Sequence, residues 1–525
     1  MNGAVRWRVT IAGLAATCAT TAIAAIAHVL VYRIAFPPEA IAQNAVGVTS
    51  GRIDSFFIQL LGHWAERLTV IGLSIGFALS GAVLAHLFPK RLLSRTAAWA
   101  VVPIPLWAFA VAVYSAPEPF LSRWEFAVAS LPIFLVGGLI GGQTLARIQS
   151  STQPLHGPAA PASVDSPLNP HVTRRSLLAA LGAGTVGVAI GSSRLATLLS
   201  GGSDTGAVRL RTTTVVRAKV PPPAPGDAAF AHIAGLTQEV TPTEDFYVVD
   251  KDILNPVIDQ SSWRLRVHGL VDNAFSLGYS GLRSMQAYER YQTLECISNK
   301  VGGQLMSTAL WTGVRLGDIL DRAGVKPGAR TVVFRAAGGY SESHSLEKAM
   351  DPTTLIAIGM NRHELPRVHG FPARLLTVGT YGMKNPKWLT DIELIDGDYR
   401  GYWEIRGWSP DQDPKITTRI DVPEDGSKVG ASTVIGGIAF AGDRGISRVQ
   451  VSADGGHSWE DARLKTALSP YTWRLWMYEW RPPRPGGYRI LARAFDGSGR
   501  VQTSTPASPF PSGAAGLDGI TLEAS

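Results

Sequence analysis

The first third of the chain alternates long apolar stretches with short charged segments. Four stretches contain no Asp, Glu, Lys or Arg, and they run from Val9 to Tyr32, Leu68 to Pro89, Thr96 to Pro117 and Phe126 to Ala146. Each has about the 20 residues that an α-helix needs to cross the hydrocarbon core of a bilayer. The pattern therefore predicts a four-helix transmembrane region over residues 1–147.

A fifth apolar stretch, Ser176 to Ser193, is shorter and rich in Ala and Gly, and it follows directly on Arg174 and Arg175. It predicts a fifth transmembrane helix over residues 176–199. The segment TRRSLLAALGAG looks like a twin-arginine export signal, with Leu177 where a Phe is more usual. The alternative is that the basic pair only anchors a helix at the cytoplasmic face.

Lysine and arginine are distributed unevenly between the flanks of these stretches. The richer set of alternating flanks carries Arg6, Arg8, Lys90, Arg91, Arg95, Arg147, Arg174 and Arg175. The poorer set carries Arg33, Arg52, Arg67 and Arg123. Cytoplasmic flanks are enriched in basic residues, so the richer set is expected to be cytoplasmic. Five crossings then predict a multi-pass protein of the cell membrane whose soluble half, after about Leu199, is extracytoplasmic.

The pattern changes after the apolar stretches. Residues 148–175 and 200–240 are rich in Pro, Ala and Ser and predict a cytoplasmic and an outer linker, the second extended by VPPPAP. Residues 241–413 contain short alternating strands and a helix in GVRLGDILDRAG, which predicts a mixed α+β domain. Residues 414–515 contain strand-sized runs separated by Gly or Pro turns, such as TVIGGIAF and YRILARAFD, which predict a β-sandwich.

Composition agrees with a membrane-attached protein of more than one folding unit. The chain has 525 residues, of which 46% are hydrophobic, and its mean hydropathy is positive. The net charge of +8 comes from basic residues that are dispersed or flank apolar segments. We find no basic stripe that could follow a phosphate backbone, so no nucleic-acid partner is predicted.

Cysteine usage narrows the chemistry further. Cys18 lies among Ala and Thr in the first apolar stretch, where it is expected to be a packing residue, and Cys296 is the only cysteine of the soluble half. A lone thiol cannot form an intrachain disulfide or a multi-cysteine zinc site, which leaves a nucleophile, a redox sensor or a single metal ligand. The alternative is a buried thiol that packs as a small hydrophobe.

Sequence blocks around Cys296 decide between these possibilities. The segments YQTLECISNKVGGQLMSTALWTGVRLGDIL, GYSESHSLEKAMDP and HGFPARLLTVGTYGMKNPKWLTDIEL resemble the sulfite oxidase family of molybdenum enzymes. The resemblance covers Thr241 to Phe510. It implies a molybdopterin (Mo-molybdopterin) domain in which the Cys296 thiolate binds molybdenum, followed by an immunoglobulin-like domain through which relatives dimerise.

The resemblance also implies the residues that bind the cofactor. The pterin carries a phosphate, which requires buried cations and backbone donors. In this chain the matching positions are Phe246, Tyr247, Val248, Val249, Asp250, His369, Arg374, Lys384, Asn385, Pro386 and Lys387. Taken singly, each position also fits a surface lysine, a structural histidine or a strand residue.

The match fails where the family holds its substrate. Sulfite-oxidising relatives place arginines around the oxyanion, because a guanidinium fork matches its geometry. Here those positions are Val249 and the segment after Cys296, in which only Lys300 is a cation. A neutral small molecule such as a sulfoxide fits at least as well as sulfite. Lys300 and Tyr340 are the predicted catalytic residues beside Cys296. The candidates for shaping the mouth of the site are Tyr340, Trp311, Trp403, Arg406 and Trp408; the alternative is that their aromatic side chains only pack in the core.

The resemblance predicts oxygen-atom transfer on a small molecule, with electrons passing to or from an outside cytochrome or quinone system. The chain has no CxxCH motif and no cysteine cluster for a second redox centre. His28 and His63 could hold a haem but suit structural roles better. A pterin cofactor inserted before export would require the folded-protein export that the twin-arginine segment suggests. The competing hypothesis is a non-catalytic, membrane-anchored binding or assembly module that keeps the molybdopterin fold.

Overall fold

The computed structural model describes most of the chain outside its linkers, namely residues 3–30, 64–88, 96–112, 123–150, 228–251, 255–411 and 413–525, with a few positions between 36 and 56. The twin-arginine pair, the fifth apolar segment, most of both predicted linkers and His63 lie outside the described residues. The N-terminal helices form one compact unit, and residues 255–525 with the segment before them form another.

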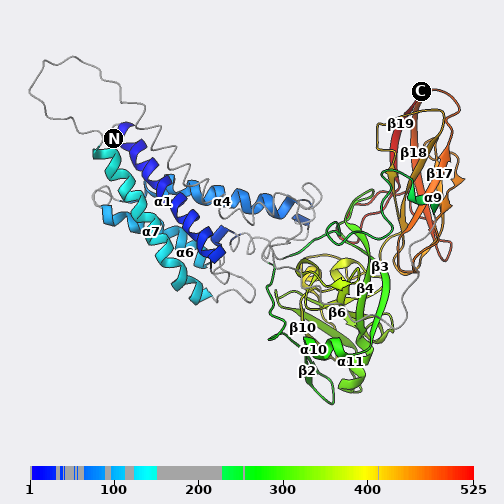
Figure 1. Cartoon of the computed structure of the whole chain (residues 1–525), viewed down its shortest axis with the longest axis horizontal. Helices are drawn as coiled ribbons and strands as arrows, with labels where there is room; N and C mark the ends of the chain where they lie inside the picture. Colours follow the sequence, from blue (N-terminus) through cyan, green and yellow to red (C-terminus); the bar gives the residue numbers. More distant parts are fainter. Residues whose placement is uncertain are drawn as a thin grey trace, which may run out of the picture. The chain divides into compact units, whose positions relative to one another are not determined.

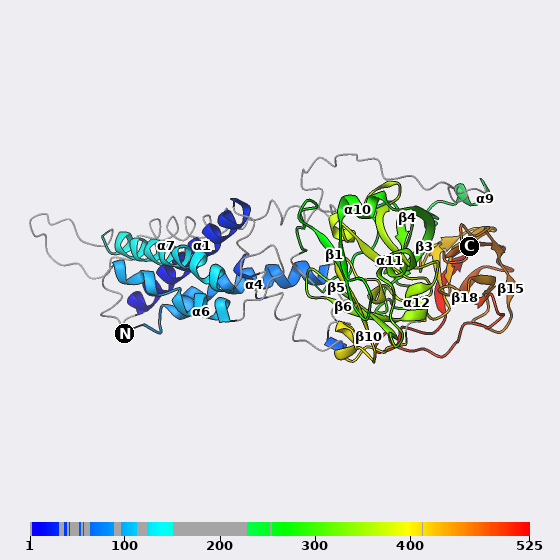
Figure 2. The same ribbon diagram turned by 90° about the horizontal axis from the view of Figure 1, so that it is seen from below.

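The N-terminal unit consists of helices, namely α1 (Gly3–Leu30), α4 (Trp64–Leu84), η1 (Thr96–Val101), α6 (Ile104–Ala112) and α7 (Arg123–Ser150). Helix α1 packs against both α4 and α7, and two views show α1 and α7 side by side (Figures 1 and 2). Where α1 crosses α4, a Cβ on Gly13 would lie 2.0 Å from the carbonyl oxygen of Gly81. Glycine is required there because the two backbones touch.

Two of these helices are long and apolar enough to cross a membrane, judged by length and composition alone, and they contain Trp7–Ala27 and Arg123–Arg147. The other two predicted spans contain shorter apolar helices, Ile71–Leu84 and Thr96–Ala112. The expected single helix from Thr96 to Pro117 is wrong, because it breaks between η1 and α6. Pro103 lacks a backbone N–H and disfavours the helical conformation of the residue before it.

The second unit begins with two sheets. The first has the order β2-β1-β10-β5-β6, from β1 (Arg264–Gly269), β2 (Phe275–Gly278), β5 (Thr331–Ala336), β6 (Ser341–Ser345) and β10 (Leu389–Ile395). The second has the order β3-β4-β7-β8 with β9 also on β7, from β3 (Ala287–Glu295), β4 (Met306–Arg315), β7 (Leu355–Met360), β8 (His363–Glu364) and β9 (Arg374–Leu376). Only the β1–β10 pair is parallel among these strands. The predicted α+β character of this region is confirmed.

Short helices connect these strands, namely α9 (Ala228–Ala231), α10 (Tyr279–Ser284), α11 (Leu316–Ala323), α12 (Leu346–Met350), η2 (Arg367–His369), η3 (Gly382–Lys384) and α13 (Tyr402–Ile405). Helix α11 buries Leu316, Ile319, Leu320 and Ala323, the spacing of one helix face. It ends at Gly324, whose φ of 68° is the left-handed conformation that glycine adopts easily. The helix predicted from GVRLGDILDRAG is therefore confirmed.

The C-terminal region consists of two further sheets. One has the order β11-β13-β17-β16, from β11 (Thr417–Val422), β13 (Thr433–Phe440), β16 (Arg463–Leu464) and β17 (Arg474–Trp480). The other has the order β12-β19-β18-β14-β15, from β12 (Lys428–Val429), β14 (Ile446–Ser452), β15 (Glu460–Asp461), β18 (Gly486–Asp496) and β19 (Asp518–Ala524). Their facing residues, such as Ile435, Trp476, Ile490 and Leu522, share one buried core. Strand β19 follows residue 515, where the predicted domain ended.

Candidate active site

Cys296 lies directly after β3, at the start of the turn that leads to β4. Its N–H donates to the carbonyl of Leu305 at 2.9 Å, and its own carbonyl accepts from the N–H of Asn299 at 2.9 Å. Cys296 is half-buried as a residue, and its sulfur lies 2.9 Å from Ser298 Oγ. Burial of the group raises the pKa of the Cys296 thiol, and the hydrogen bonds from Ser298 partly offset this. A bound metal cation would favour the thiolate over the thiol.

Asn299 braces the turn that carries Cys296. Its side chain donates to Glu295 Oε1 at 3.1 Å and accepts from the N–H of Leu305 at 3.0 Å, which closes the turn across its base. Glu295 is buried, and burial raises the pKa of its carboxyl group to about 7. Its second oxygen, Oε2, has no hydrogen-bond partner among the described atoms. The sulfur is therefore held by a closed turn whose buried carboxyl group is incompletely satisfied.

The block before β1 packs against β4 and against the segment that carries His369. Phe246 stacks on Tyr247 with 5.5 Å between ring centroids, and it contacts Trp311 and His369 edge to face at 5.5 and 5.3 Å. Burial raises the pKa of Tyr247, and the charge of the Cys296 thiolate raises it further. Tyr247 therefore lies near the proposed ligand. Val248 and Val249 are half-buried and bring no charge, and Asp250 pairs with Lys387.

His369 and Arg374 come from the segment HGFPAR. His369 Nε2 lies 3.2 Å from the carbonyl oxygen of Thr243, and burial lowers the pKa of its imidazole to about 3, so the ring is neutral. The Arg374 guanidinium donates to the carbonyls of His369 and Asn385 at 3.1 and 3.2 Å and lies over the Trp311 ring. Burial lowers the pKa of Arg374 to about 10, and its Nε has no partner among the described atoms.

The segment GMKNPKW places its two lysines differently from the expectation. Lys384 Nζ lies 2.6 Å from Glu342 Oε1 and 2.7 Å from Glu404 Oε1, and all three side chains are buried. Lys387 pairs with Asp250 and donates to the carbonyl of Val368 at 2.9 Å. Both ammonium groups are therefore already engaged by the protein, and their contact with a phosphate stays a prediction.

Asn385 and Pro386 hold this loop rather than face an anion. The Asn385 side chain accepts from the N–H of Thr377 at 2.7 Å and donates to Thr380 Oγ1 and to the Tyr381 carbonyl. The carbonyl of Pro386 accepts from the N–H of Leu375 at 2.9 Å. These bonds fix the backbone on which Lys384 and Lys387 stand.

Tyr340 lies on the other side of Cys296. Its hydroxyl donates to the carbonyl of Met383 at 2.6 Å, and its ring lies 5.7 Å from that of Tyr402. Burial raises the pKa of Tyr340 well above its usual value, followed by the charges of Glu342, Glu404 and Cys296. Tyr340 is thus close enough to Cys296 for the thiolate to influence it.

The other predicted mouth residues divide into packed and exposed groups. Trp311 is fully buried and donates its indole N–H to the carbonyl of Gln292, so it packs within the core. Trp408 is buried in an apolar cluster with Ile297, and Trp403 packs against that cluster while partly exposed. Lys300 is exposed at the end of the turn that follows Cys296.

Three buried acids of this site were missed from the sequence, Glu295, Glu342 and Glu404. Only Glu342 had a usable signal: in the strand segment SESHS it alternates with His344 on one face, and both are buried. Nothing in the spacing of Glu295 or Glu404 distinguishes them from solvated carboxylates. Among the described residues there is no cluster of three or more His, Cys, Asp and Glu that could hold a metal ion.

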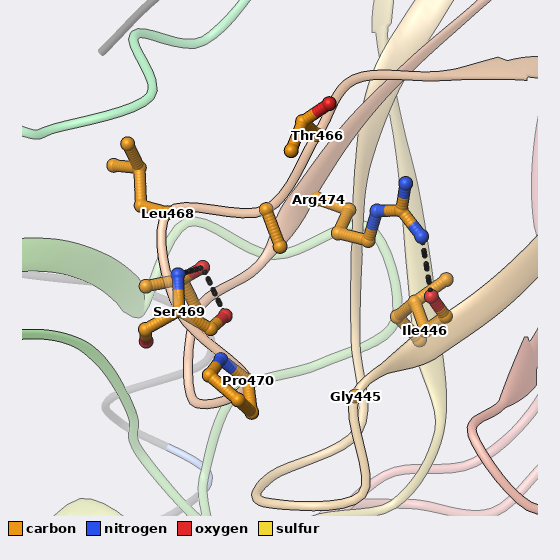
Figure 3. A pocket seen from close by; sticks show the side chains of 9 residues that line it. Gly445, Ile446, Thr466, Leu468, Ser469, Pro470 and Arg474 are labelled. Atoms are coloured by element: carbon orange, nitrogen blue, oxygen red, sulfur yellow. Dashed lines mark hydrogen bonds between the residues drawn. The ribbon is translucent and has the colours of Figure 1, made fainter. Parts of the chain in front are cut away.

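A cavity of about 460 Å³ lies apart from Cys296, in the C-terminal sheets (Figure 3). Its lining includes Leu468, Ser469 and Arg474 from the turn before β17. Arg474 donates to the carbonyl of Ile446 at 2.7 Å, so its guanidinium is engaged across the cavity. No part of the candidate site borders this cavity.

Two family models match the chain in succession. Residues 253–403 match the oxidoreductase molybdopterin binding domain, and residues 410–508 match the Mo-co oxidoreductase dimerisation domain. The first contains Cys296, His369, Arg374 and the Lys384 to Lys387 loop, and the second contains β11 to β18.

Curated relatives agree with this match. Mitochondrial sulfite oxidase of Rattus norvegicus is 29% identical over 321 residues, which are 52% of this chain and 59% of the relative. Sulfite oxidase of Gallus gallus is 30% identical over 321 residues, covering 51% of this chain and 69% of the relative. The chain thus spans less than two thirds of the length of the mitochondrial relatives. Among solved structures, the sulfane dehydrogenase SoxCD from Paracoccus pantotrophus has a TM-score of 0.47 and 22% identity, covering 54% of this chain and 81% of that chain.

Proposed function

This chain belongs to the sulfite oxidase family of molybdopterin-dependent oxidoreductases, and from that premise we propose that it transfers oxygen atoms to or from a small substrate with Cys296 as its molybdenum ligand. The single observation that carries the assignment is the half-buried Cys296 in a turn that Asn299 closes through Glu295 and Leu305. When bound, the cofactor supplies the two-electron oxygen-atom chemistry.

The residues present fit such a cofactor. Arg374 is 5% exposed, and its Nε has no partner among the described atoms, which suits an anion brought into the pocket. Phe246 and Trp311 give the same pocket apolar walls, and neutral His369 adds a ring without competing for negative charge. Arg374 is therefore the residue that we assign to the pterin phosphate, ahead of Lys384 and Lys387.

The protein's remaining part is to position the substrate and exclude water. Charged groups near Tyr340 among the described residues are Glu342, Glu404 and Lys384, together with Arg406, whose guanidinium lies 3.6 Å from the centre of the Tyr402 ring. Two carboxylates offset the one ammonium and the one guanidinium, so the described groups near Tyr340 offer an oxyanion no excess positive charge. We therefore favour a neutral oxo-donor such as a sulfoxide, which gives up its oxygen atom and takes up two electrons and two protons to give a sulfide and water.

The source of those electrons lies outside this chain. A one-electron partner of the cytochrome or quinone class is required, because the chain has no motif for a second redox centre in its soluble half. The C-terminal region matches a dimerisation domain, and its two facing sheets support an immunoglobulin-like sandwich through which two copies pair. We propose a homodimer on this basis.

Anchoring in the cell membrane is part of the same proposal. The segments Trp7–Ala27 and Arg123–Arg147 have sufficient length and apolar character, and the distribution of Lys and Arg favours a soluble half on the extracytoplasmic side. The twin-arginine segment supports export of a domain that has already received its cofactor. A protease added to intact cells or spheroplasts tests this orientation. Only an extracytoplasmic domain is degraded without lysis.

The decisive experiment combines metal analysis with a substrate screen. The full chain is purified in detergent from a host that makes molybdopterin, and molybdenum and pterin are measured per chain. Oxo-donors and oxo-acceptors, including sulfite and dimethyl sulfoxide, are then tested with a redox dye. We expect stoichiometric molybdenum and turnover of a neutral substrate. Absence of molybdenum from well-folded protein would support the non-catalytic module instead.

A further inference from the structure

Lys384 is the centre of a buried cluster of three charges, which we call the Lys384 cluster: Glu342, Lys384 and Glu404. The side chains are 0%, 2% and 7% exposed, and the ammonium lies 2.6 and 2.7 Å from one oxygen of each carboxylate. The three residues come from β6, η3 and α13 respectively. Two carboxylates against one ammonium leave the cluster without excess positive charge. It is therefore poorly suited to attract the pterin phosphate, the role that the family resemblance implied for Lys384.

The cluster is a main anchor of the short helix α13. Each of its four residues is at least partly exposed as a whole, with Ile405 at its end 68% exposed, and only the Glu404 side chain reaches the interior, at 7% exposed. Its Glu404 carboxylate accepts the N–H of Gly401 at 3.1 Å with one oxygen and faces Lys384 with the other. A helix of one turn has little stability of its own, so its position depends on contacts outside it. The Glu404 contact is the one that ties it to a buried charge.

The side chains on α13 contact the residues around Cys296. The Tyr402 ring lies 5.7 Å from the ring of Tyr340 and 5.0 Å from the ring of Trp403. Trp403 packs against the apolar cluster that contains Ile297, the residue after Cys296. Tyr340 itself is fastened to the same loop as Lys384, because its hydroxyl donates to the carbonyl of Met383. Helix α13 thus contributes two aromatic side chains, Tyr402 and Trp403, beside Tyr340, which directly precedes β6.

We propose that Lys384 is a positioning residue that holds α13 beside Cys296, so that Tyr402 and Trp403 form the wall that contacts the substrate. That Tyr402 and Trp403 contact a substrate rests on the proposed function. That Lys384 holds α13 in place does not depend on it. Lys384 acts through Glu404 on α13 and through Glu342 on β6. The specificity of the site then depends on an ion pair that touches neither substrate nor cofactor.

The first test uses Glu404→Gln, which removes one carboxylate and leaves the Glu342 and Lys384 pair balanced. The helix lies between two trypsin sites, Arg400 and Arg406. In the full chain in detergent, we expect cleavage at these sites to become about tenfold faster, since a charge-assisted hydrogen bond is lost. With dimethyl sulfoxide and a reduced viologen dye, KM should rise by about tenfold while kcat changes by less than about twofold. Molybdenum per chain should not change.

Companion variants separate positioning from phosphate binding. Lys384→Arg keeps the charge and should preserve the slow cleavage, whereas Lys384→Met should cleave as fast as Glu404→Gln and keep its molybdenum. The matched control is Lys415→Met, because Lys415 pairs with Asp411 at 3.6 Å on the surface and its side chain is 41% exposed. We expect that control to behave as the unaltered chain in cleavage and in KM.

Two results would overturn the inference. If Lys384→Met loses molybdenum while Glu404→Gln keeps the original cleavage rate, Lys384 binds the cofactor and does not position α13. If Glu404→Gln leaves both cleavage and KM unchanged, the cluster has no influence on the helix. Failure of the proposed function is distinguishable, since molybdenum-loaded wild-type protein would then turn over no tested substrate while the cleavage comparison still decides the structural part.

Discussion

The interior of the molybdopterin-binding region and the interior of the C-terminal domain both contain charged side chains, but they satisfy them differently. In the C-terminal domain, Asp496 is fully buried and receives hydrogen bonds from its own turn and from Arg444 and Arg500. Arg419 pairs with Asp421 and donates to two further oxygens. Among the described residues 413–525, no buried side-chain polar atom lacks a partner.

Around Cys296 the buried charged groups are incompletely hydrogen-bonded. Glu295, Glu342 and Arg374 each have a buried atom without a hydrogen-bond partner among the described atoms, and the Lys384 cluster sets two carboxylates against one ammonium. Unsatisfied buried groups destabilise a fold, so they are expected where a ligand or a reaction needs them. The comparison teaches that burial of charge by itself does not mark a site in this protein. Around Cys296 this burial is accompanied by incomplete hydrogen bonding, although Arg290 and Arg315 elsewhere in the same region also have a buried Nε without a partner among the described atoms.

The largest effect expected on the molybdopterin-binding side is that of Cys296→Ser. Loss of the thiolate should reduce turnover by about a thousandfold or more, equivalent to about 4 kcal/mol of transition-state stabilisation. The thermal unfolding midpoint should change little, because the oxygen of serine fits the same turn. Cys18→Ser is the matched control and should keep its activity. Full turnover of a molybdenum-loaded Cys296→Ser protein would remove the assigned ligand.

A core substitution in the C-terminal domain should have the opposite effect, lowering stability and leaving activity unchanged. Trp476 is fully buried, and its indole N–H donates to the carbonyl of Ile438 at 3.0 Å. Trp476→Ala should lower the free energy of unfolding by about 3–5 kcal/mol, measured by urea titration, while the folded fraction keeps its KM and kcat. Trp476→Phe should lower the free energy of unfolding less. A loss of activity without a loss of stability would show that the two interiors are not separable in this way.

The pKa of His369 gives a smaller effect that depends on pH. Its imidazole has a pKa of about 3 in the folded chain, whereas the unfolded chain takes up the proton near pH 6.5. Between these values the unfolded state binds more protons, so stability is full above about pH 6.5 and is lost as the pH falls toward 3. At pH 5 the loss should be about 2 kcal/mol. Urea titrations at pH 7.5 and 5 should show this loss and show it reduced in His369→Gln; an equal loss in both proteins would contradict it.

The smallest effect is expected for an exposed ion pair of the molybdopterin-binding region. Arg330 and Asp396 lie 2.7 Å apart with side chains 72% and 58% exposed. Arg330→Ala should change the free energy of unfolding by less than about 1 kcal/mol and leave molybdenum content unchanged. A double-mutant cycle with Asp396→Asn measures the pair itself. A coupling free energy as large as the effect of Trp476→Ala would show that exposed ion pairs contribute as much to stability as the buried core, against this expectation.

Much of the architecture follows from local pattern. Alternation in WRLRVHGLV and RTVVFRAA predicted β1 and β5, and the spacing of GVRLGDILDRAG predicted α11, because one face of each element must be buried. The single helix from Thr96 to Pro117 failed because hydropathy counts apolar residues and does not weigh a proline at position 103. Strand β19 was missed because it lies beyond the last turn signals, and pairing with β18 and β12 defines it.

The sequence by itself determined the enzyme family and the molybdopterin cofactor, through a lone cysteine in its family block and the cationic segments that follow it. Tertiary structure alone decided which charged side chains are free to contact a cofactor and which are already paired within the protein. Lys384 looks like a phosphate ligand in the chain, yet Glu342 and Glu404 converge on it from two other elements. The physical reason is that a buried ammonium is fixed by the nearest carboxylates in space, and their distance along the chain carries no information about that contact.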